Sequence, residues 1–276
     1  MSLAVLRSEL SKLYRQRVTY ASFGVILVLV ALITWGSHRQ RERLDISERI
    51  GAEFVVAGKT VTSLFVAQAV MDPALMVLAP VLVAVTAGAL IAGERQLGTL
   101  RTLLTRPIPR LAVLVAKLIA GWSWAILLTL FLGLSALGLG YAVFGWGDLV
   151  IFRGGLTILE PHMGLIRLAE AYGLACASMC AVATWGLMLS AIFDNAMTAA
   201  GLTVAVFLVS GTVGAMPYFE SIRHYLVTTH MTLYRDVLRT SIDYDGLWTS
   251  AQYLAAYTLA AAVIAGLAFA RRDVTC

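Results

Sequence analysis

Six long stretches of the sequence carry no charged side chain, and they constrain the fold more than any other feature. They cover residues 18–37, 73–93, 118–147, 171–193, 196–219 and 246–270. A helix rises about 1.5 Å per residue, so roughly 20 apolar residues cross the hydrocarbon core of a bilayer. Only 13% of the residues are charged, against about 25% in soluble domains. The sequence therefore predicts an all-α membrane protein with six transmembrane helices.

We expect the spans at about residues 18–37, 73–93, 118–143, 171–193, 196–216 and 250–270, after an amphipathic leader at 1–17. The third run exceeds one crossing, so it either tilts or ends at the interface in "YAVFGWG". Asp72 and Pro73 suit the cap and first position of a helix, so the second span is expected to begin there. Residues 38–72 then form an external segment with surface helices, or alternatively a re-entrant dip.

The positions of lysine and arginine predict the orientation. With six spans, the termini and the 93–117 segment share a side that holds eleven basic and four acidic residues, against ten basic and twelve acidic on the other. The eleven lie in short segments close to the helix ends, where the positive-inside rule is strongest. We therefore expect both termini in the cytoplasm.

Several classes of function lack their residues in this chain. No ionisable side chain lies inside the six runs, which argues against ion-coupled transport, although backbone carbonyls can also hold Na⁺. Intramembrane protease motifs are missing, and Gly58-Lys59-Thr60 has the wrong glycine spacing for a phosphate loop. We predict no catalytic residue, no metal site, no cofactor bound by this chain and no nucleic-acid partner. Any energy for uphill transport must then come from a partner.

The stretch "GERQLGTLRTLLTRPIPR", residues 93–110, follows the second run directly. On a helix, Leu97, Leu100, Leu104 and Ile108 form one stripe with Leu103 at its margin, and Arg95, Arg106 and Arg110 project opposite. Pro107 ends such a helix near Thr105. The residues alone leave two readings open, an interfacial helix with its leucines in lipid and a helix that docks on a partner.

The same stretch resembles the signature of the ABC-2 family of ABC transporter permeases. The matching positions are Glu94, Gly98-Thr99-Leu100, Leu103-Leu104, Pro107, Arg110 and Lys117. "LSAIFDNAMTAA" is similar to the family's tight turn between spans four and five, and "FARRDVT" to its usual ending. The resemblance implies the ABC-2 (type V exporter-like) architecture, with a cytoplasmic coupling helix at about 94–106.

The resemblance also implies a function. Two permease chains, here expected to be identical, would assemble with two copies of a cytoplasmic ATPase subunit that binds ATP and Mg²⁺. The coupling helix would transmit ATPase movement to the spans, mostly for export. The residues expected to couple to the ATPase are Glu94, Arg95, Leu97, Gly98, Thr99, Leu100, Arg101, Leu103, Leu104 and Arg106. Glu94 is expected to pair with the leader's arginines or with Arg95.

Without charges in the spans, a transport cavity would be apolar or lined by hydroxyl groups. The candidate cavity-lining residues are Ser135, Ser178, Thr184, Thr203 and Ser210. Residues 217–245 either form an outer gate, as in similar permeases, or an ordinary surface loop. Two other functions stay open: a membrane subunit that drives an extracytoplasmic partner without carrying a solute, and a partner-free channel or scaffold.

Overall fold

The structure, a computed structural model, describes residues 3–41, 61–99, 109–153 and 155–271. The long elements are α2 (Arg17–Arg41), α4 (Ser63–Pro73), the π-helical turn η1 (Ala74–Leu78), α5 (Ala79–Gln96), α7 (Arg110–Phe144), α8 (Pro161–Ile192), α9 (Ala196–Ala215) and α12 (Tyr244–Arg271). The shorter ones are α1 (Leu3–Tyr14), β1 (Leu149–Ile151), β2 (Thr157–Leu159), the 3-10 helix η2 (Pro217–Tyr225), α10 (Val227–Met231) and α11 (Leu233–Val237).

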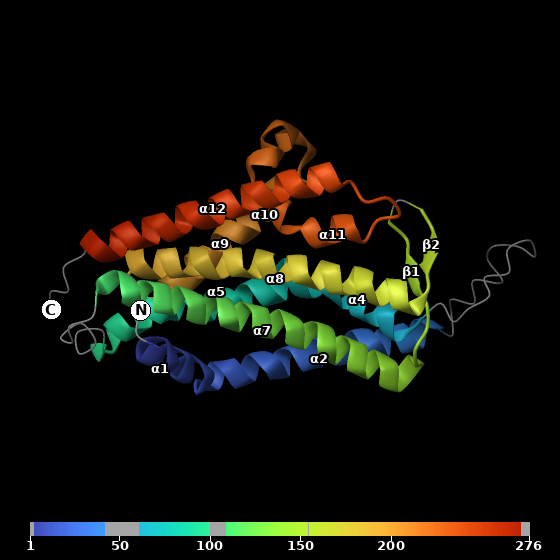
Figure 1. Cartoon of the computed structure of the whole chain (residues 1–276), viewed down its shortest axis with the longest axis horizontal. Helices are drawn as coiled ribbons and strands as arrows, with labels where there is room; N and C mark the ends of the chain where they lie inside the picture. The colour runs from blue at the N-terminus through green and yellow to red at the C-terminus, as the bar shows by residue number, and fades with distance from the viewer. Residues whose placement is uncertain (1–2, 42–60, 100–108, 154, 272–276) are drawn as a thin grey trace, which may run out of the picture.

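The long helices form an elongated bundle (Figure 1). The start of α1 and the end of α12 lie at one end, called the terminal end below, and β1 and β2 lie at the other, called the hairpin end. Helix α8 is central, because it packs against α5, α7, α9, α11 and α12. Its residues are small where the helices meet, and Ala171, Ala175 and Ala181 are fully buried. Small residues let helix backbones approach closely in a membrane, where no hydrophobic effect drives helices together.

The prediction of six spans is confirmed, because six described helices are long and apolar enough to cross a membrane. The chain is not purely helical, however. β1 and β2 pair antiparallel with Leu149 opposite Leu159, and the connection between spans three and four was not expected to contain strands. This hairpin caps the hairpin end of the bundle (Figure 1).

The expected start of the second span is wrong. The helix begins ten residues earlier, where Thr62 accepts a hydrogen bond from the Phe65 backbone at 3.2 Å. Pro73 lies inside the continuous stretch from 63 to 96, and the π-helical turn η1 follows it. Such local π adjustments re-satisfy the backbone groups that a proline frees in a membrane helix. Asp72 therefore caps nothing, and residues 63–72 continue the helix of the second span rather than forming a separate surface helix.

Other helices also extend beyond the predicted spans. Helix α8 begins at Pro161, ten residues before the expected 171, and α12 begins at Tyr244. Charged residues such as Arg167 and Glu170 limit how far a helix enters hydrocarbon, but they do not end the helix itself. The rest of the expected external segment, residues 42–60, lies outside the described residues.

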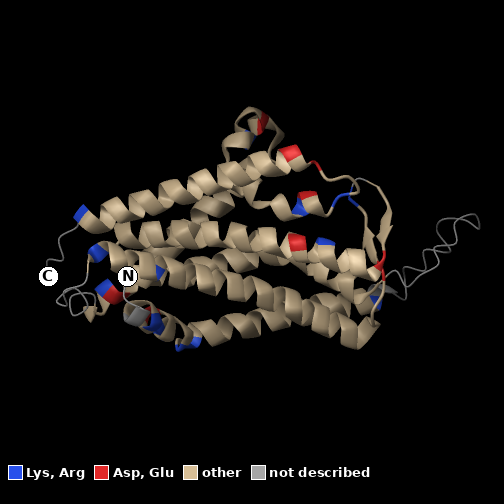
Figure 2. Ribbon diagram, in the orientation of Figure 1, with Lys and Arg blue, Asp and Glu red and all other residues tan. Residues whose placement is uncertain are grey.

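Charged side chains gather at the two ends of the bundle and leave its middle free (Figure 2). Among the described residues, the terminal end has more basic than acidic side chains. The basic ones are Arg7, Lys12, Arg15, Arg17, Arg95, Arg110, Lys117 and Arg271, and the acidic ones are Glu9, Glu94 and Asp194. This distribution agrees with the asymmetry on which the predicted orientation depends.

Residues 217–245 form the short helices η2, α10 and α11 before α12 begins. Helix α10 packs against α9 and α12, while α11 packs against α8. The segment is thus folded onto the bundle rather than extended. Its role as an outer gate stays a prediction.

Candidate functional site

The end of α5 holds the first residues of the expected coupling helix. Glu94 and Arg95 lie in the last turn of α5, so they belong to the second span and not to a separate helix. Leu97 ends the helix, and Gly98 follows with φ +70°. Glycine adopts this left-handed conformation without strain and commonly stops a helix. A continuous helix over 94–106 is therefore interrupted at Gly98, and Thr99 turns back to donate to the Glu94 carbonyl at 3.2 Å.

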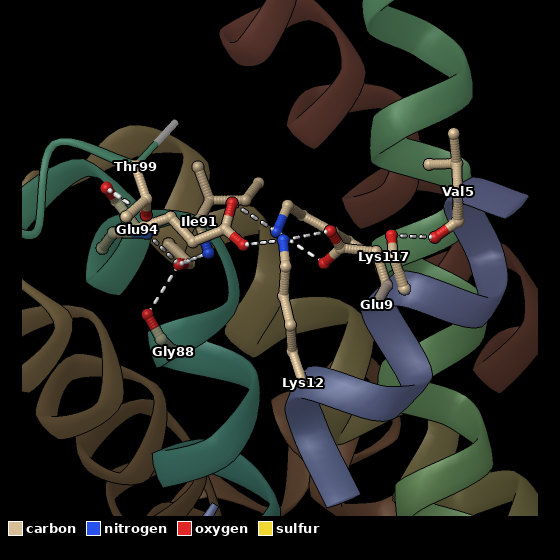
Figure 3. Close-up of polar contacts among 11 residues, drawn as sticks. Val5, Glu9, Lys12, Gly88, Ile91, Glu94, Thr99 and Lys117 are labelled. Atoms are coloured by element: carbon tan, nitrogen blue, oxygen red, sulfur yellow. Dashed lines mark hydrogen bonds and ion pairs between the residues drawn. The ribbon is translucent and has the colours of Figure 1, made fainter. Parts of the chain in front are cut away.

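Glu94 is part of a closed ring of four alternating charges, called the charge ring below and formed with Glu9, Lys12 and Lys117 (Figure 3). Lys117 Nζ lies 2.8 Å from Glu9 Oε2 and 2.7 Å from Glu94 Oε2. Lys12 Nζ lies 2.8 Å from Glu9 Oε1 and 2.9 Å from Glu94 Oε1. Each lysine thus bridges both glutamates. The ring joins α1, α5 and α7 at the terminal end.

Burial differs strongly around the charge ring. The side chains of Lys117 and Glu9 are 1% and 2% exposed, Glu94 is 15% exposed and Lys12 is 48% exposed. Burial opposes ionisation of Glu9, but the ammonium groups of Lys117 and Lys12 outweigh it and lower the pKa of the Glu9 carboxyl. Burial also opposes the charge on Lys12, but its bonds to the two glutamates raise its pKa. Both shifts favour the charged forms of Glu9 and Lys12.

The leader α1 is held in place by more than the charge ring. Leu13 is 1% exposed, and the Tyr14 hydroxyl donates to Ser123 on α7 at 3.2 Å. The Thr19 hydroxyl at the start of α2 donates to the Leu13 carbonyl at 2.7 Å. Because α1 packs against α7, Glu9 and Lys12 are positioned on a fixed surface.

The end of α5 is also fastened to the turn between α8 and α9. Arg95 Nη1 lies 2.7 Å from Asp194 Oδ1, and Gln96 Oε1 accepts from the Ala196 backbone at 3.3 Å. Asn195 caps α9 by accepting from the Met197 backbone at 2.8 Å. The expected tight turn between spans four and five is present, since α8 ends at Ile192 and α9 begins at Ala196.

One turn before Glu94, Ser190 of α8 enters the hydrogen-bond ladder of α5. Its hydroxyl donates to the Gly88 carbonyl at 2.6 Å and accepts from the Ile91 and Ala92 amides at 3.1 and 2.9 Å. A side chain inserted into the ladder is one of the recognised places where a helix bends. The last two turns of α5 are therefore held by α8 as well as by the charge ring.

Two large apolar side chains are exposed near the end of α5 and the start of α9. Leu97 is 79% exposed and Met197 is 84% exposed. The other residues of the expected coupling set, Leu100, Arg101, Leu103, Leu104 and Arg106, lie outside the described residues. The coupling role of the whole set stays a prediction. The expected pairing of Glu94 with an arginine is wrong: its partners are Lys12 of the leader and Lys117, and Arg95 binds Asp194 instead.

The candidate cavity-lining hydroxyl groups are mostly occupied by helix packing. Ser178, Thr184 and Thr203 are fully buried, and each donates to the carbonyl four residues earlier in its own helix. Ser135 bonds the Leu132 carbonyl, and Ser210 bonds Thr228. None of the five lines either of the two pockets described below. Their place on a transport path stays a prediction.

The charge ring is suited to transmit force rather than to carry out a reaction. Each of its four side chains lies within 2.9 Å of an oppositely charged partner, so the ring links three helices through ion pairs. Among the described residues, no group of three or more His, Cys, Asp or Glu could hold a metal ion. A displacement of Glu94 must move Lys117 and Glu9 with it, because an unpaired buried charge is costly.

Sequence reasoning missed the roles of Glu9, Lys12 and Lys117. Lys117 lies in the second turn of α7 among apolar residues, and a charge in such a place requires a partner. Glu9 is the only acidic residue of the leader. Those two signals predict that each needs an opposite charge, but only the packing of α1 on α7 identifies the pair.

Comparison with known proteins agrees with this geometry. A family model described as ABC-2 family transporter protein matches residues 5–210, which is more than half of the chain. The uncharacterized protein YhcI of Bacillus subtilis (strain 168) is 34% identical over 134 residues, which make up 46% of this chain and 42% of the relative. The chain thus matches less than half the length of that relative. With six apolar helices and a family match that spans α1 to α9, the chain belongs to the ABC-2 transporter family and is a multi-pass membrane protein.

Proposed function

We propose that this chain is the permease subunit of an ATP-driven exporter, and that a separate ATPase drives it from the cytoplasmic side. Two copies of the ATPase and two copies of this chain would form the transporter. ATP and Mg²⁺ would bind to the ATPase. The chain itself would lie in the bacterial inner membrane with both termini in the cytoplasm.

One observation carries the proposal: the charge ring lies directly before the turn at Gly98. Glu94, one turn from the exposed Leu97, is bound to α7 through the buried Lys117 and to α1 through Lys12. A partner that pushes on residues 97–106 would therefore move three helices as one body. The excess of basic residues at this end supports its cytoplasmic side.

The proposal is tested with the chain co-expressed with its copurifying ATPase and reconstituted in proteoliposomes. Glu94→Ala and Leu100→Asp are expected to insert and assemble normally but to lower transport-stimulated ATP hydrolysis several-fold. Matched controls at the hairpin end are Glu170→Ala and Leu156→Asp, both at exposed positions. Unchanged ATPase coupling in both test variants would refute the proposal.

The same preparation separates export from the two other functions. An exporter gives ATP hydrolysis that rises with a solute, whereas a subunit that drives an extracytoplasmic partner responds only to that partner. A partner-free channel or scaffold retains no ATPase during purification from native membranes. Reporter fusions at the C-terminus test the orientation, with a cytoplasmic signal expected.

A further inference from the structure

Two adjoining pockets lie toward the hairpin end, away from the charge ring. The first, called the polar pocket, has a volume of about 220 Å³, and its polar lining side chains are Gln68, Asp72, Arg153, Tyr234 and Arg235. The second, called the apolar pocket, has a volume of about 380 Å³ and lies between η1, α9, α10 and α11. The apolar pocket by itself has a volume within the range of ligand sites, roughly 300–1,000 Å³.

The two pockets meet at α11. Tyr234 lines both of them. Arg235 lines the polar pocket, and its Nη2 lies 2.7 Å from the sulfur of Met76, which lines the apolar pocket. A ligand that fills both pockets would thus pass the edge of the Arg235 guanidinium.

The polar pocket carries one positive charge in excess. Asp72 binds both Arg153 and Arg235, and the Arg235 Nε lies 2.9 Å from Asp72 Oδ1. The Tyr234 hydroxyl donates to the same oxygen at 3.1 Å. Burial raises the pKa of Tyr234 to about 12, so the phenol stays neutral. One carboxylate therefore faces two guanidinium groups.

The pocket also has unused hydrogen-bonding capacity. A guanidinium has five N–H donors, and the bonds within the described residues use one nitrogen of Arg153 and two of Arg235. The side-chain oxygen of Gln68 is buried and has no donor among the described residues. The unused guanidinium donors suit a headgroup with anionic oxygens, which guanidinium recognises through paired bonds. The Gln68 oxygen is an acceptor and would instead take a hydroxyl or N–H donor of the same ligand.

The depth of the pockets fits a molecule that is polar at one end and apolar at the other. Asp72 is 22 residues from Glu94 along one helical span, or about 33 Å, which is about the thickness of the hydrocarbon core. The polar pocket therefore lies at the membrane surface opposite the charge ring. Leu75, Met76 and Pro80 of the apolar pocket follow within eight residues of Asp72, or about 12 Å, toward the membrane interior.

We infer that the joined pockets bind one lipid-like amphiphile, with its anionic headgroup at Arg153 and Arg235 and its tail between η1 and α9. A purely structural network would also tie the hairpin to α11, but it would not need an apolar pocket that continues from the charged one. The statement that this amphiphile is the transported solute rests on the proposed export function. The statement that it binds in the joined pockets does not depend on that function.

The test uses the purified full chain in phosphatidylcholine nanodiscs with labelled dodecyl phosphate as the probe. Unlabelled dodecyl phosphate should compete at least tenfold better than dodecyl maltoside, which has the same tail on a neutral head. Inorganic phosphate, the head alone, should not compete at the same concentrations. Equal competition by dodecyl maltoside would overturn the anionic headgroup, and equal competition by inorganic phosphate would overturn the amphiphile.

Two pairs of variants locate the site. Arg235→Gln should weaken probe binding at least tenfold, while Arg223→Gln removes the same charge from an exposed position outside both pockets. Gly211→Leu should block the tail, because Gly211 lines the apolar pocket and an added Cβ meets no atom within 4 Å. Gly201→Leu makes the same change elsewhere on α9, where Cβ also meets nothing within 4 Å.

Variants that bind no worse than their controls would overturn the inference. The glycine pair keeps the test decisive if Arg235→Gln fails to fold. The ATPase-coupling assay with Glu94→Ala is independent of these measurements. If coupling is lost in Glu94→Ala and no variant affects probe binding, the proposed function stands and this inference fails.

Discussion

Replacing Lys117 by methionine is the most direct test of the charge ring. Methionine keeps most of the apolar stem but leaves Glu9, 2% exposed, without its buried partner. Removing one member of a buried ion pair typically costs about 3–5 kcal/mol. The matched change Lys12→Met removes the half-exposed lysine, and pairs at the surface contribute about 1 kcal/mol or less. The loss of stability should therefore be several times larger for Lys117→Met, although both variants lose one positive charge.

The pH dependence of this loss follows from Glu9. The wild-type pKa of Glu9 is lowered from 4.5, because the two lysines outweigh its burial. Its contribution to stability is therefore present above pH 4.5 and is lost as the pH falls through the lower folded value. Without Lys117, burial is opposed by Lys12 alone, so the pKa of Glu9 rises above its wild-type value. Protonation of Glu9 then removes the unpaired buried charge in Lys117→Met. The difference in stability between this variant and the wild type should therefore narrow as the pH falls from 7.5 to 5.

Thermal unfolding in one neutral detergent, followed by intrinsic fluorescence, measures both effects. At about 2–4 °C per kcal/mol for a chain of this size, Lys117→Met should lower the Tm by about 6–20 °C at pH 7.5. The double variant Glu9→Gln with Lys117→Met should recover part of this loss, because it removes the unpaired charge. If the Tm falls no more than in Lys12→Met, or if the difference is the same at both pH values, the ring does not act as a buried ionic clamp.

Three further predictions concern the contacts that hold α5 against its neighbouring helices. Gly88→Ala should destabilise the protein by about 1–3 kcal/mol in thermal unfolding, because its Cβ would lie 2.7 Å from the backbone nitrogen of Ala200, whereas Gly138→Ala, with nothing within 4 Å, should not. Ser190→Ala should cost about 1–3 kcal/mol and speed hydrogen exchange at the two amides that the hydroxyl accepts from. Arg95→Gln should change the stability by about 1 kcal/mol or less, because its partner carboxylate is 69% exposed; a larger drop in Tm would contradict that estimate.

The six spans could be predicted because a bilayer imposes one length on every helix that crosses it. The ends of the helices could not, since charge marks where hydrocarbon stops and not where hydrogen bonding stops. Helix α8 continues past Arg167, whose Nη1 donates to the Val237 carbonyl at 3.1 Å. The Asp72-Pro73 pair led to a wrong prediction of a helix start. It has the residues of a helix start, but Thr62 caps the helix earlier and Asp72 is held by two arginines.

The candidate site was predictable in position but not in its contacts. The charge at Glu94 marks the end of the second charge-free run, and α5 does end there, at Gln96. The stop at Gly98 was not predicted, because the coupling helix was expected to continue through it. The partner of Glu94 depends on where residues 9 and 117 lie in space, and no local pattern carries that information. The arginines of the leader were as good candidates as Lys12 on charge alone, because long-range pairing is decided by helix packing.

None of the five candidate hydroxyl groups lines either described pocket, and a hydroxyl group inside a helix has a physical reason to need no cavity. A serine or threonine inside a helix can donate to the carbonyl four residues earlier, as Ser178, Thr184 and Thr203 do. Such a group satisfies itself and needs no ligand or water. A guanidinium cannot do so within one helix turn, because its five donors exceed the available acceptors. Arg153, which follows β1, and Arg235 of α11 are therefore better indicators of a ligand site in this chain than the hydroxyl groups within the spans.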